Sequence, residues 1–127
     1  MAVKHQRFDT RQTMHNQTFE IFRYKDSYPK EVTLHHHDFY EVYFFLSGNV
    51  QYNIESRSYL LTPGDVLLIS PMELHQPMVG DEHRVYERIV LWIDKQFLDC
   101  SKEICRGGAL PRLCRSIYRR ERNHAQT

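Results

Sequence analysis

Short stretches in which hydrophobic and polar residues alternate, separated by turn residues, run through most of the chain. Such alternation predicts β-strands, because successive side chains of a strand point to opposite faces. Turn signals recur about every eight to twelve residues, which favours an antiparallel sandwich or barrel over a fold of alternating strands and helices. The seven or eight predicted strands lie at residues 18–24, 34–46, 50–55, 59–61, 66–69, from His75 onward, and 85–93.

Two turns in this pattern have a specific chemistry. Gly48 follows the second predicted strand in a Ser-Gly-Asn sequence that is typical of a tight hairpin. Pro63 and Gly64 fit the two central positions of a type II turn, the second of which needs a positive φ. Residues 66–69 are all apolar, so we expect a strand that is buried on both faces.

The pattern becomes helical near the C-terminus. Asp94 can cap a short helical turn that reaches Leu98, and two glycines then interrupt the chain. Residues 110–123 place apolar side chains along one face of a helix and arginines along the other. The apolar stripe consists of Leu110, Leu113, Cys114, Ile117 and Tyr118. Such a stripe docks on its own domain or packs against a second copy of the chain, and the sequence leaves both open.

The length and composition describe one globular domain. A chain of 127 residues with 41% hydrophobic and 13% aromatic residues can bury a real core. We expect residues 1–18 to form a flexible polar arm and residues 19–98 to form the barrel. Residues 99–127 would then form a helical dimerisation or linker segment.

Charge and cysteine usage point to a cytoplasmic protein without direct nucleic-acid binding. The net charge is +1, although six arginines and a single glutamate lie from Arg106 onward. The three cysteines form no Cys-x-x-Cys pair, so free thiols in a reducing cytoplasm are expected. The N-terminus lacks the apolar run of a signal peptide, and no stretch approaches the roughly 18 apolar residues of a membrane span.

The candidate chemistry begins at a run of three histidines. On a strand, His35, His37 and Glu41 share one face, which Tyr43 continues as part of a cavity wall. Two imidazoles and a carboxylate pointing the same way supply three ligands of a first-row metal ion. The same three groups can instead bind a sugar or a carboxylate by hydrogen bonds.

This spacing resembles the first motif of the cupin superfamily, apart from the opening glycine, in whose position Pro29 stands. The matching residues are His35, His37, Glu41 and Gly48. The second cupin motif is represented, with altered spacing, by Gly64, Pro71 and His75. The resemblance implies a mainly β fold: a double-stranded β-helix, or jelly-roll barrel, with a short C-terminal helical segment.

Residues 19–98 are more specifically similar to the N-terminal effector domain of AraC-type transcriptional regulators. The similarity is carried by HHHDFYEVYFFLSGNVQYNIESRSYLLTPGDVLLISPMELHQP and by the following YERIVLWID. Regulators of this type carry a C-terminal pair of helix-turn-helix units, and none can be placed in residues 94–127. The resemblance therefore implies a sensor half, which reaches DNA only through a separate C-terminal domain.

The cupin resemblance also implies a set of metal ligands. By position these are His35, His37, Glu41 and His75. The set suits zinc, nickel, iron or manganese, and the sequence does not choose among them. Alternatively, these residues line a ligand pocket without a metal, as in regulators that keep the fold.

Glu87 is a further candidate ligand residue, on a predicted strand face with Val85, Ile89 and Leu91. If that face points into the barrel, the carboxylate can accept hydrogen bonds from a sugar-like effector. Otherwise we expect Glu87 to pair with Arg88 or Arg57. Trp92 falls on the opposite face, so it is expected on the outside of the barrel.

Two functions from different classes follow. The first is the sensing and dimerisation domain of an AraC-type regulator, with a small-molecule effector (a sugar is one candidate) in the barrel and a homodimer through the C-terminal helix. The second is a stand-alone metal-dependent cupin enzyme of the sugar isomerase or dioxygenase type. The inner faces offer little acid or base apparatus besides Glu87, which favours the sensor.

Overall fold

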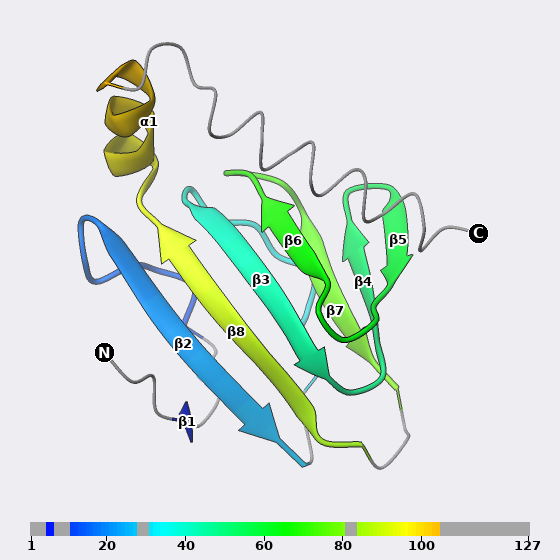
Figure 1. Ribbon diagram of the computed structural model, residues 1–127. Helices are drawn as coiled ribbons and strands as arrows, with labels where there is room; N and C mark the ends of the chain where they lie inside the picture. The colour runs from blue at the N-terminus through cyan, green and yellow to red at the C-terminus, as the bar shows by residue number, and fades with distance from the viewer. Residues whose placement is uncertain (1–4, 7–10, 28–30, 81–83, 105–127) are drawn as a thin grey trace.

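The computed structural model of the chain describes residues 5–6, 11–27, 31–80 and 84–104 (Figure 1). These residues form eight strands and one helix, in agreement with the mainly β prediction. The elements are β1 (His5–Gln6), β2 (Phe19–Asp26), β3 (Tyr40–Ser47), β4 (Val50–Ile54), β5 (Arg57–Leu60), β6 (Val66–Ile69), β7 (His75–Val79), β8 (Tyr86–Ile93) and α1 (Lys95–Ile104). The predicted helix 110–123, which includes Cys114, lies outside the described residues, and so does Cys105. Cys100, an exposed residue within α1, is a free thiol.

The strands form two sheets that pack as a jelly-roll-like pair of layers. The larger sheet has the order β1-β2-β8-β3-β6 and the smaller one the order β5-β4-β7. All pairings are antiparallel except that of β1 with β2. Figure 1 shows β2, β8 and β3 as long neighbouring strands, with β4, β5 and β7 in the second layer. Within the described residues the two ladders stay separate, so the layers face each other without closing into one continuous barrel.

The inner faces of both sheets meet in one core. β8 alternates regularly between buried and half-buried side chains, and Tyr86, Arg88, Val90 and Trp92 point inward. β3, β4 and β6 contribute the fully buried side chains Phe45, Val50, Leu67 and Ile69. The expectation that residues 66–69 are buried on both faces is wrong, because Val66 and Leu68 are only half-buried. β6 is an edge strand of the larger sheet, and only one of its two faces points toward the core. Every second residue is therefore buried.

The predicted strand 34–46 begins later than expected. β3 starts at Tyr40, which pairs with the last residue of β8, Ile93. Before Tyr40 the larger sheet has no partner strand left for the chain. His35 instead forms an isolated bridge with His75, at the start of β7 in the smaller sheet. The histidine run therefore crosses from one sheet to the other, and this crossing positions the site described below.

The turns follow the predicted chemistry. Gly64 has φ +96°, and the backbone N–H of Asp65 donates to the carbonyl of Thr62 at 3.0 Å, as a type II turn requires. Gly48 has φ +127°, and a Cβ at this position would lie 3.2 Å from Cα of Tyr86. Gly48 is therefore needed both for the backbone conformation and for the close approach of β8.

Asp94 caps the helix as predicted, although the helix is longer than expected. Its side-chain oxygen accepts a hydrogen bond from the backbone N–H of Phe97 at 3.0 Å, and α1 continues to Ile104. None of the helices among the described residues has the length and apolar character needed to cross a membrane.

The N-terminal segment contacts the larger sheet. β1 pairs with β2, and the Arg11 side chain donates to Glu20 at 2.9 Å. The Arg11 guanidinium also lies over the rings of Phe22 and Trp92, at 5.6 and 5.4 Å from their centroids. The part of the predicted arm from Arg11 onward is thus held against the larger sheet by an ion pair and cation–π contacts.

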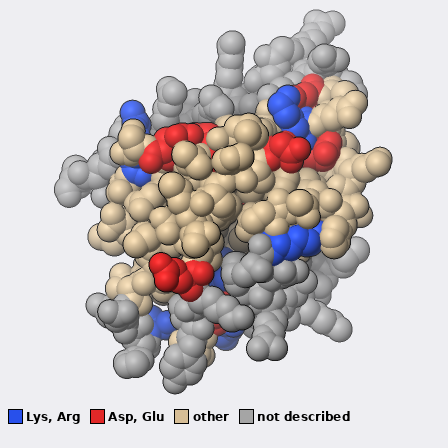
Figure 2. All heavy atoms as spheres, turned by 180° about the vertical axis from the view of Figure 1, so that it is seen from behind, with Lys and Arg blue, Asp and Glu red and all other residues tan. Residues whose placement is uncertain are grey.

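The face seen from behind is mostly uncharged at its centre. Figure 2 shows acidic and basic side chains toward the edges of this face, with other residues between them. The exposed side chains of the smaller sheet include Gln51, Ser58, Leu60 and Met78. Among the described residues this face offers no broad basic surface of the kind that binds the phosphates of nucleic acids.

Candidate metal and ligand site

Three histidines meet at one point inside the fold, two from the segment that leads into β3 and one from the start of β7. One ring nitrogen from each of His35, His37 and His75 lies within 4.8 Å of the others. The backbones of His35 and His75 exchange two hydrogen bonds, at 3.1 and 2.9 Å. The backbone N–H of Met72 donates to the carbonyl of His37 at 2.7 Å. The three imidazoles are therefore held in place by main-chain contacts, which do not depend on a ligand.

Each imidazole has its Nδ1 atom engaged by a backbone carbonyl. The pairs are His35 with Thr33 at 2.7 Å, His37 with Phe39 at 3.1 Å, and His75 with Glu73 at 2.8 Å. A carbonyl oxygen only accepts hydrogen bonds, so Nδ1 must carry the proton in all three rings. A neutral ring with this tautomer has its lone pair on Nε2. The Nε2 atom of His37, which lies 3.3 Å from Oε1 of Glu41, can donate to that carboxylate only when the ring is protonated at both nitrogens. At metal sites the ring nitrogen of a ligating imidazole that does not bind the metal commonly donates to a backbone carbonyl, as Nδ1 does here.

His75 shows most clearly that the centre suits a cation. The residue is completely buried, and burial lowers the pKa of its imidazole to about 4, so it is neutral at neutral pH. Its Nε2 atom is enclosed without a hydrogen-bond partner. A buried lone pair without a partner costs roughly 1–3 kcal/mol. A metal ion at this atom would remove that cost.

Glu41 supplies a buried carboxylate beside the histidines. Its Oε1 atom accepts a hydrogen bond from Nε1 of Trp92 at 3.0 Å and lies 3.3 Å from Nε2 of His37. Its Oε2 atom is 3.5 Å from the hydroxyl of Tyr52. Burial opposes ionisation, but the hydrogen bond with His37, the adjacent His75 and the Trp92 donor together hold the pKa of Glu41 below its ordinary value. Glu41 is thus an anion in contact with the histidine cluster.

This donor set fits a divalent first-row transition metal. Three neutral imidazoles and a carboxylate are the ligands that zinc, nickel, iron and manganese share, and the three histidines can hold such an ion. The residues came from two motifs that are far apart in the sequence. The structure brings His35, His37 and His75 together and places Glu41 against His37.

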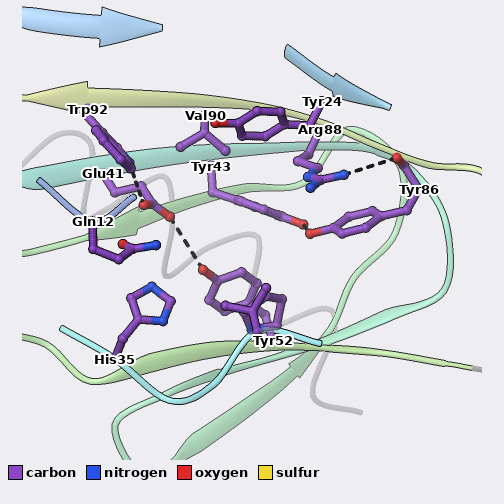
Figure 3. Close-up of a pocket in the computed structure, with 12 residues that line it drawn as sticks. Gln12, Tyr24, His35, Glu41, Tyr43, Tyr52, Tyr86, Arg88, Val90 and Trp92 are labelled. Atoms are coloured by element: carbon purple, nitrogen blue, oxygen red, sulfur yellow. Dashed lines mark hydrogen bonds between the residues drawn. The ribbon is translucent and has the colours of Figure 1, made fainter. Parts of the chain in front are cut away.

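A cavity of about 50 Å3 extends from this centre between the two sheets. Figure 3 shows His35, Gln12, Glu41 and Trp92 at one end and Arg88, Tyr24 and Tyr86 at the other, with Tyr43 and Tyr52 between them. The Oε1 atom of Gln12 is buried without a hydrogen-bond partner. Burial raises the pKa of Tyr86 to about 12 and the pKa values of Tyr43 and Tyr52 well above the ordinary value, so all three phenols stay neutral.

Of the further residues that the sequence proposed for this cavity, some line it and others do not. Tyr43 lines it, as expected. Glu87 lies on the opposite face of β8, where its carboxylate accepts from the Arg23 side chain at 2.6 and 3.0 Å. Trp92 was expected on the outside, and this prediction is wrong: Trp92 points inward and donates to Glu41.

Sequence reasoning missed Arg88 and Gln12. Both faces of β8 carry apolar residues, so alternation alone could not tell which face is inside. The useful signal was the single tryptophan, the largest apolar side chain, which favours the enclosed face. Arg88 shares that face. Gln12 lies in a polar segment with no periodicity, and no local pattern marks it as a cavity residue.

The chain has the fold of the cupins. A cupin protein from Bacteroides fragilis superposes with a TM-score of 0.53 at 21% sequence identity, over 61% of this chain and 67% of that one. A Cupin 2 conserved barrel domain protein from Salinispora arenicola gives 0.54 at 21% identity, over 74% and 77%. The DMSP lyase DddQ from Ruegeria pomeroyi gives 0.54 at 22% identity, over 63% of this chain but only 40% of the lyase. At these identities the similarity establishes the fold alone.

The family follows from the sequence match. Residues 18–119 match the AraC-like ligand binding domain, and the chain belongs to this family. No curated protein sequence matches the chain. The chain is therefore a small-molecule-binding domain of the cupin fold.

Proposed function

We propose that the chain is the effector-sensing part of an AraC-type transcriptional regulator, with a small molecule bound in the cavity beside a metal ion. His35, His37, His75 and Glu41 would hold the metal. The observation that carries this proposal is the buried Nε2 atom of His75, which has no hydrogen-bond partner and lies among two further imidazoles. The family match supports the sensing role.

The metal would supply an electrophile that binds an oxygen atom of the effector. Four protein ligands leave one or two coordination positions for the effector or water in an ion that accepts five or six ligands. The protein orients the ligands through the carbonyls behind each Nδ1 atom. Several polar groups that line the cavity are buried between the two sheets, which strengthens polar contacts inside it.

The effector signal would pass through the N-terminal segment. Gln12 lines the cavity, and Arg11 lies over Trp92, which in turn holds Glu41. An effector that contacts these residues differently in two arrangements of the segment shifts the balance between those arrangements. We further propose that the apolar stripe of residues 110–123 joins two copies of the chain, so that the shift is communicated within a dimer.

The histidines and Glu41, which the sequence identified, do not by themselves indicate the chemical class of the effector. A sugar was suggested by a carboxylate in the cavity at Glu87, and that side chain faces Arg23 instead. A sugar therefore has no support from Glu87. The remaining cavity residues, Arg88 among them, favour a different chemical class.

The proposal is tested by the metal content and thermal stability of tag-free protein. Wild-type protein and His36→Ala are expected to bind about one zinc ion per chain, because His36 is exposed and lies outside the cluster. His37→Ala and His75→Ala are expected to lose it. At a free zinc concentration 100 times the Kd, zinc should stabilise the first two proteins by about 2.7 kcal/mol. Equal metal uptake by all four proteins would contradict the site.

The same preparation distinguishes the sensor from a cupin enzyme. A sensor is stabilised by its effector and leaves it unchanged. Turnover of a sugar or diol by the metal-loaded protein, lost in His75→Ala and kept in His36→Ala, would instead support the metal-dependent enzyme.

A further inference from the structure

The end of the cavity away from the histidines is built around a buried cation. Arg88 is 4% exposed, and its Nη1 atom donates to Asp26 at 2.5 Å and to the carbonyl of Tyr86 at 3.4 Å. Its guanidinium lies 4.9 Å from the ring centroid of Tyr24 and 4.0 Å from that of Tyr86. The guanidinium is therefore fixed in place before any ligand binds, and it lines the cavity.

Two phenol hydroxyls add donor capacity beside this cation. The hydroxyls of Tyr43 and Tyr86 are hydrogen-bonded to each other. A phenol carries its hydroxyl hydrogen at neutral pH, so the hydrogen-bonded pair holds two hydroxyl hydrogens. Their mutual bond uses one hydrogen, and the other remains to be donated. An acceptor in the cavity next to Arg88 would take it.

The two ends of the cavity favour the same kind of ligand group. The histidine end would hold a metal cation, and the Arg88 end presents a guanidinium and a hydroxyl donor. Asp26 offsets part of the Arg88 charge, but it does not line the cavity. Glu41, the carboxylate that does, already accepts from Trp92 and Tyr52. A ligand with oxygen atoms at both ends would match the metal ion at one end and the hydrogen-bond donors at the other. A carboxylate suits the Arg88 end, because its oxygens only accept hydrogen bonds.

The strand register sets the length of such a ligand. Trp92 donates a hydrogen bond to Glu41 and therefore marks the histidine end of the cavity. Arg88 precedes Trp92 by four residues on β8. At a rise of about 3.3 Å per residue, their Cα atoms are roughly 13 Å apart. Side chains close part of this distance, so a ligand of about four carbons spans the rest. A cavity of about 50 Å3 also favours a short chain over a full sugar.

We propose that the cavity binds a short-chain hydroxy acid, with its carboxylate at Arg88 and the Tyr43–Tyr86 hydroxyl pair and its hydroxyl oxygens at the histidine centre. The buried Oε1 atom of Gln12, which has no partner, would accept a hydrogen from a ligand hydroxyl. This inference rests on the proposed small-molecule sensor and names the chemical class of its effector.

The test compares two four-carbon probes with the zinc-loaded full chain by isothermal titration calorimetry. L-Threonate carries a carboxylate where L-threitol carries a hydroxymethyl group, and the remaining hydroxyls match. Threonate is expected to bind at least about tenfold more tightly, because a hydrogen bond to a charged group contributes roughly 1.5–3 kcal/mol. Tyr43→Phe should weaken threonate binding about tenfold and threitol binding less, because a hydrogen bond to an uncharged hydroxyl is weaker, and it should keep the zinc content, since Tyr43 is not a metal ligand. Tyr40→Phe is the matched control, since its hydroxyl bonds to Asp99 outside the cavity.

The outcomes separate this inference from the function on which it rests. Zinc-loaded protein that binds threitol as tightly as threonate overturns the hydroxy-acid inference and leaves a metal-centred sensor standing. Threonate binding that is unchanged in Tyr43→Phe also overturns the inference. Protein that takes up no zinc and binds neither probe overturns both. If Arg88→Lys folds, it should weaken threonate but not threitol, because an ammonium cannot reproduce the guanidinium fork.

Discussion

Replacing Trp92 by phenylalanine tests whether the inner face of β8 supports the site. Phenylalanine keeps an aromatic ring in the core but removes the Nε1–H group that donates to Glu41 at 3.0 Å. Loss of a hydrogen bond to a buried carboxylate costs roughly 1.5–3 kcal/mol. The smaller ring also buries less apolar surface, which adds about 1 kcal/mol. The weaker contact with the Arg11 guanidinium adds roughly 0.5 kcal/mol.

The free energy of unfolding is therefore expected to fall by about 3–4.5 kcal/mol. Urea unfolding followed by circular dichroism measures this change, since Trp92 is the only tryptophan and fluorescence is lost with it. Phe19→Leu is the control: Phe19 is 53% exposed on the same sheet, so its replacement should change stability by about 0.5 kcal/mol or less. A similarly small effect of Trp92→Phe would refute the inward placement of Trp92 and the support of Glu41.

Three further predictions concern the hairpin, the N-terminal segment and self-association. Gly48→Ala should destabilise the protein by roughly 1–3 kcal/mol in urea unfolding, because φ is +127° and the new Cβ meets Tyr86; an unchanged midpoint would contradict the tight turn. Burial opposes ionisation of Glu20, but Arg11 and two backbone N–H groups lower its pKa, so their contribution to stability is present at neutral pH and lost as the pH falls below about 4.5. Carboxyl-carbon NMR should show Glu20 titrating below its ordinary pKa in wild type and higher in Arg11→Ala; identical titrations would exclude the ion pair as the cause. Leu113→Glu should convert a dimer to a monomer in sedimentation velocity, and an unchanged dimer would remove residues 110–123 from the interface.

The fold was predictable from the sequence because local signals agreed along the chain. Alternation placed most strands to within one or two residues, and Gly64 and Asp94 fixed a turn and a helix start. The start of β3 was missed because it depends on where β8 ends, at Ile93, which is a tertiary constraint. No local pattern near the histidines contains that information.

The site was only partly predictable, for a related reason. Motif spacing identified the three histidines, which the structure brings together. The choice between Glu87 and Arg88 as the inner residue of β8 depends on which apolar face is enclosed, and both faces are apolar. A shift of one residue in this assignment exchanges a carboxylate for a guanidinium in the cavity. It therefore changes the expected effector from a neutral sugar to an anion.

The central claim is that one metal ion is bound by the three imidazoles of His35, His37 and His75 and by Glu41. X-ray absorption at the zinc edge of tag-free, zinc-loaded protein measures this directly. The account predicts a first shell of nitrogen and oxygen ligands at about 2.0–2.2 Å, with outer-shell scattering from three imidazoles that falls to two in His75→Ala. A spectrum with fewer than two imidazoles in the wild type, or one unchanged by His75→Ala, would contradict it.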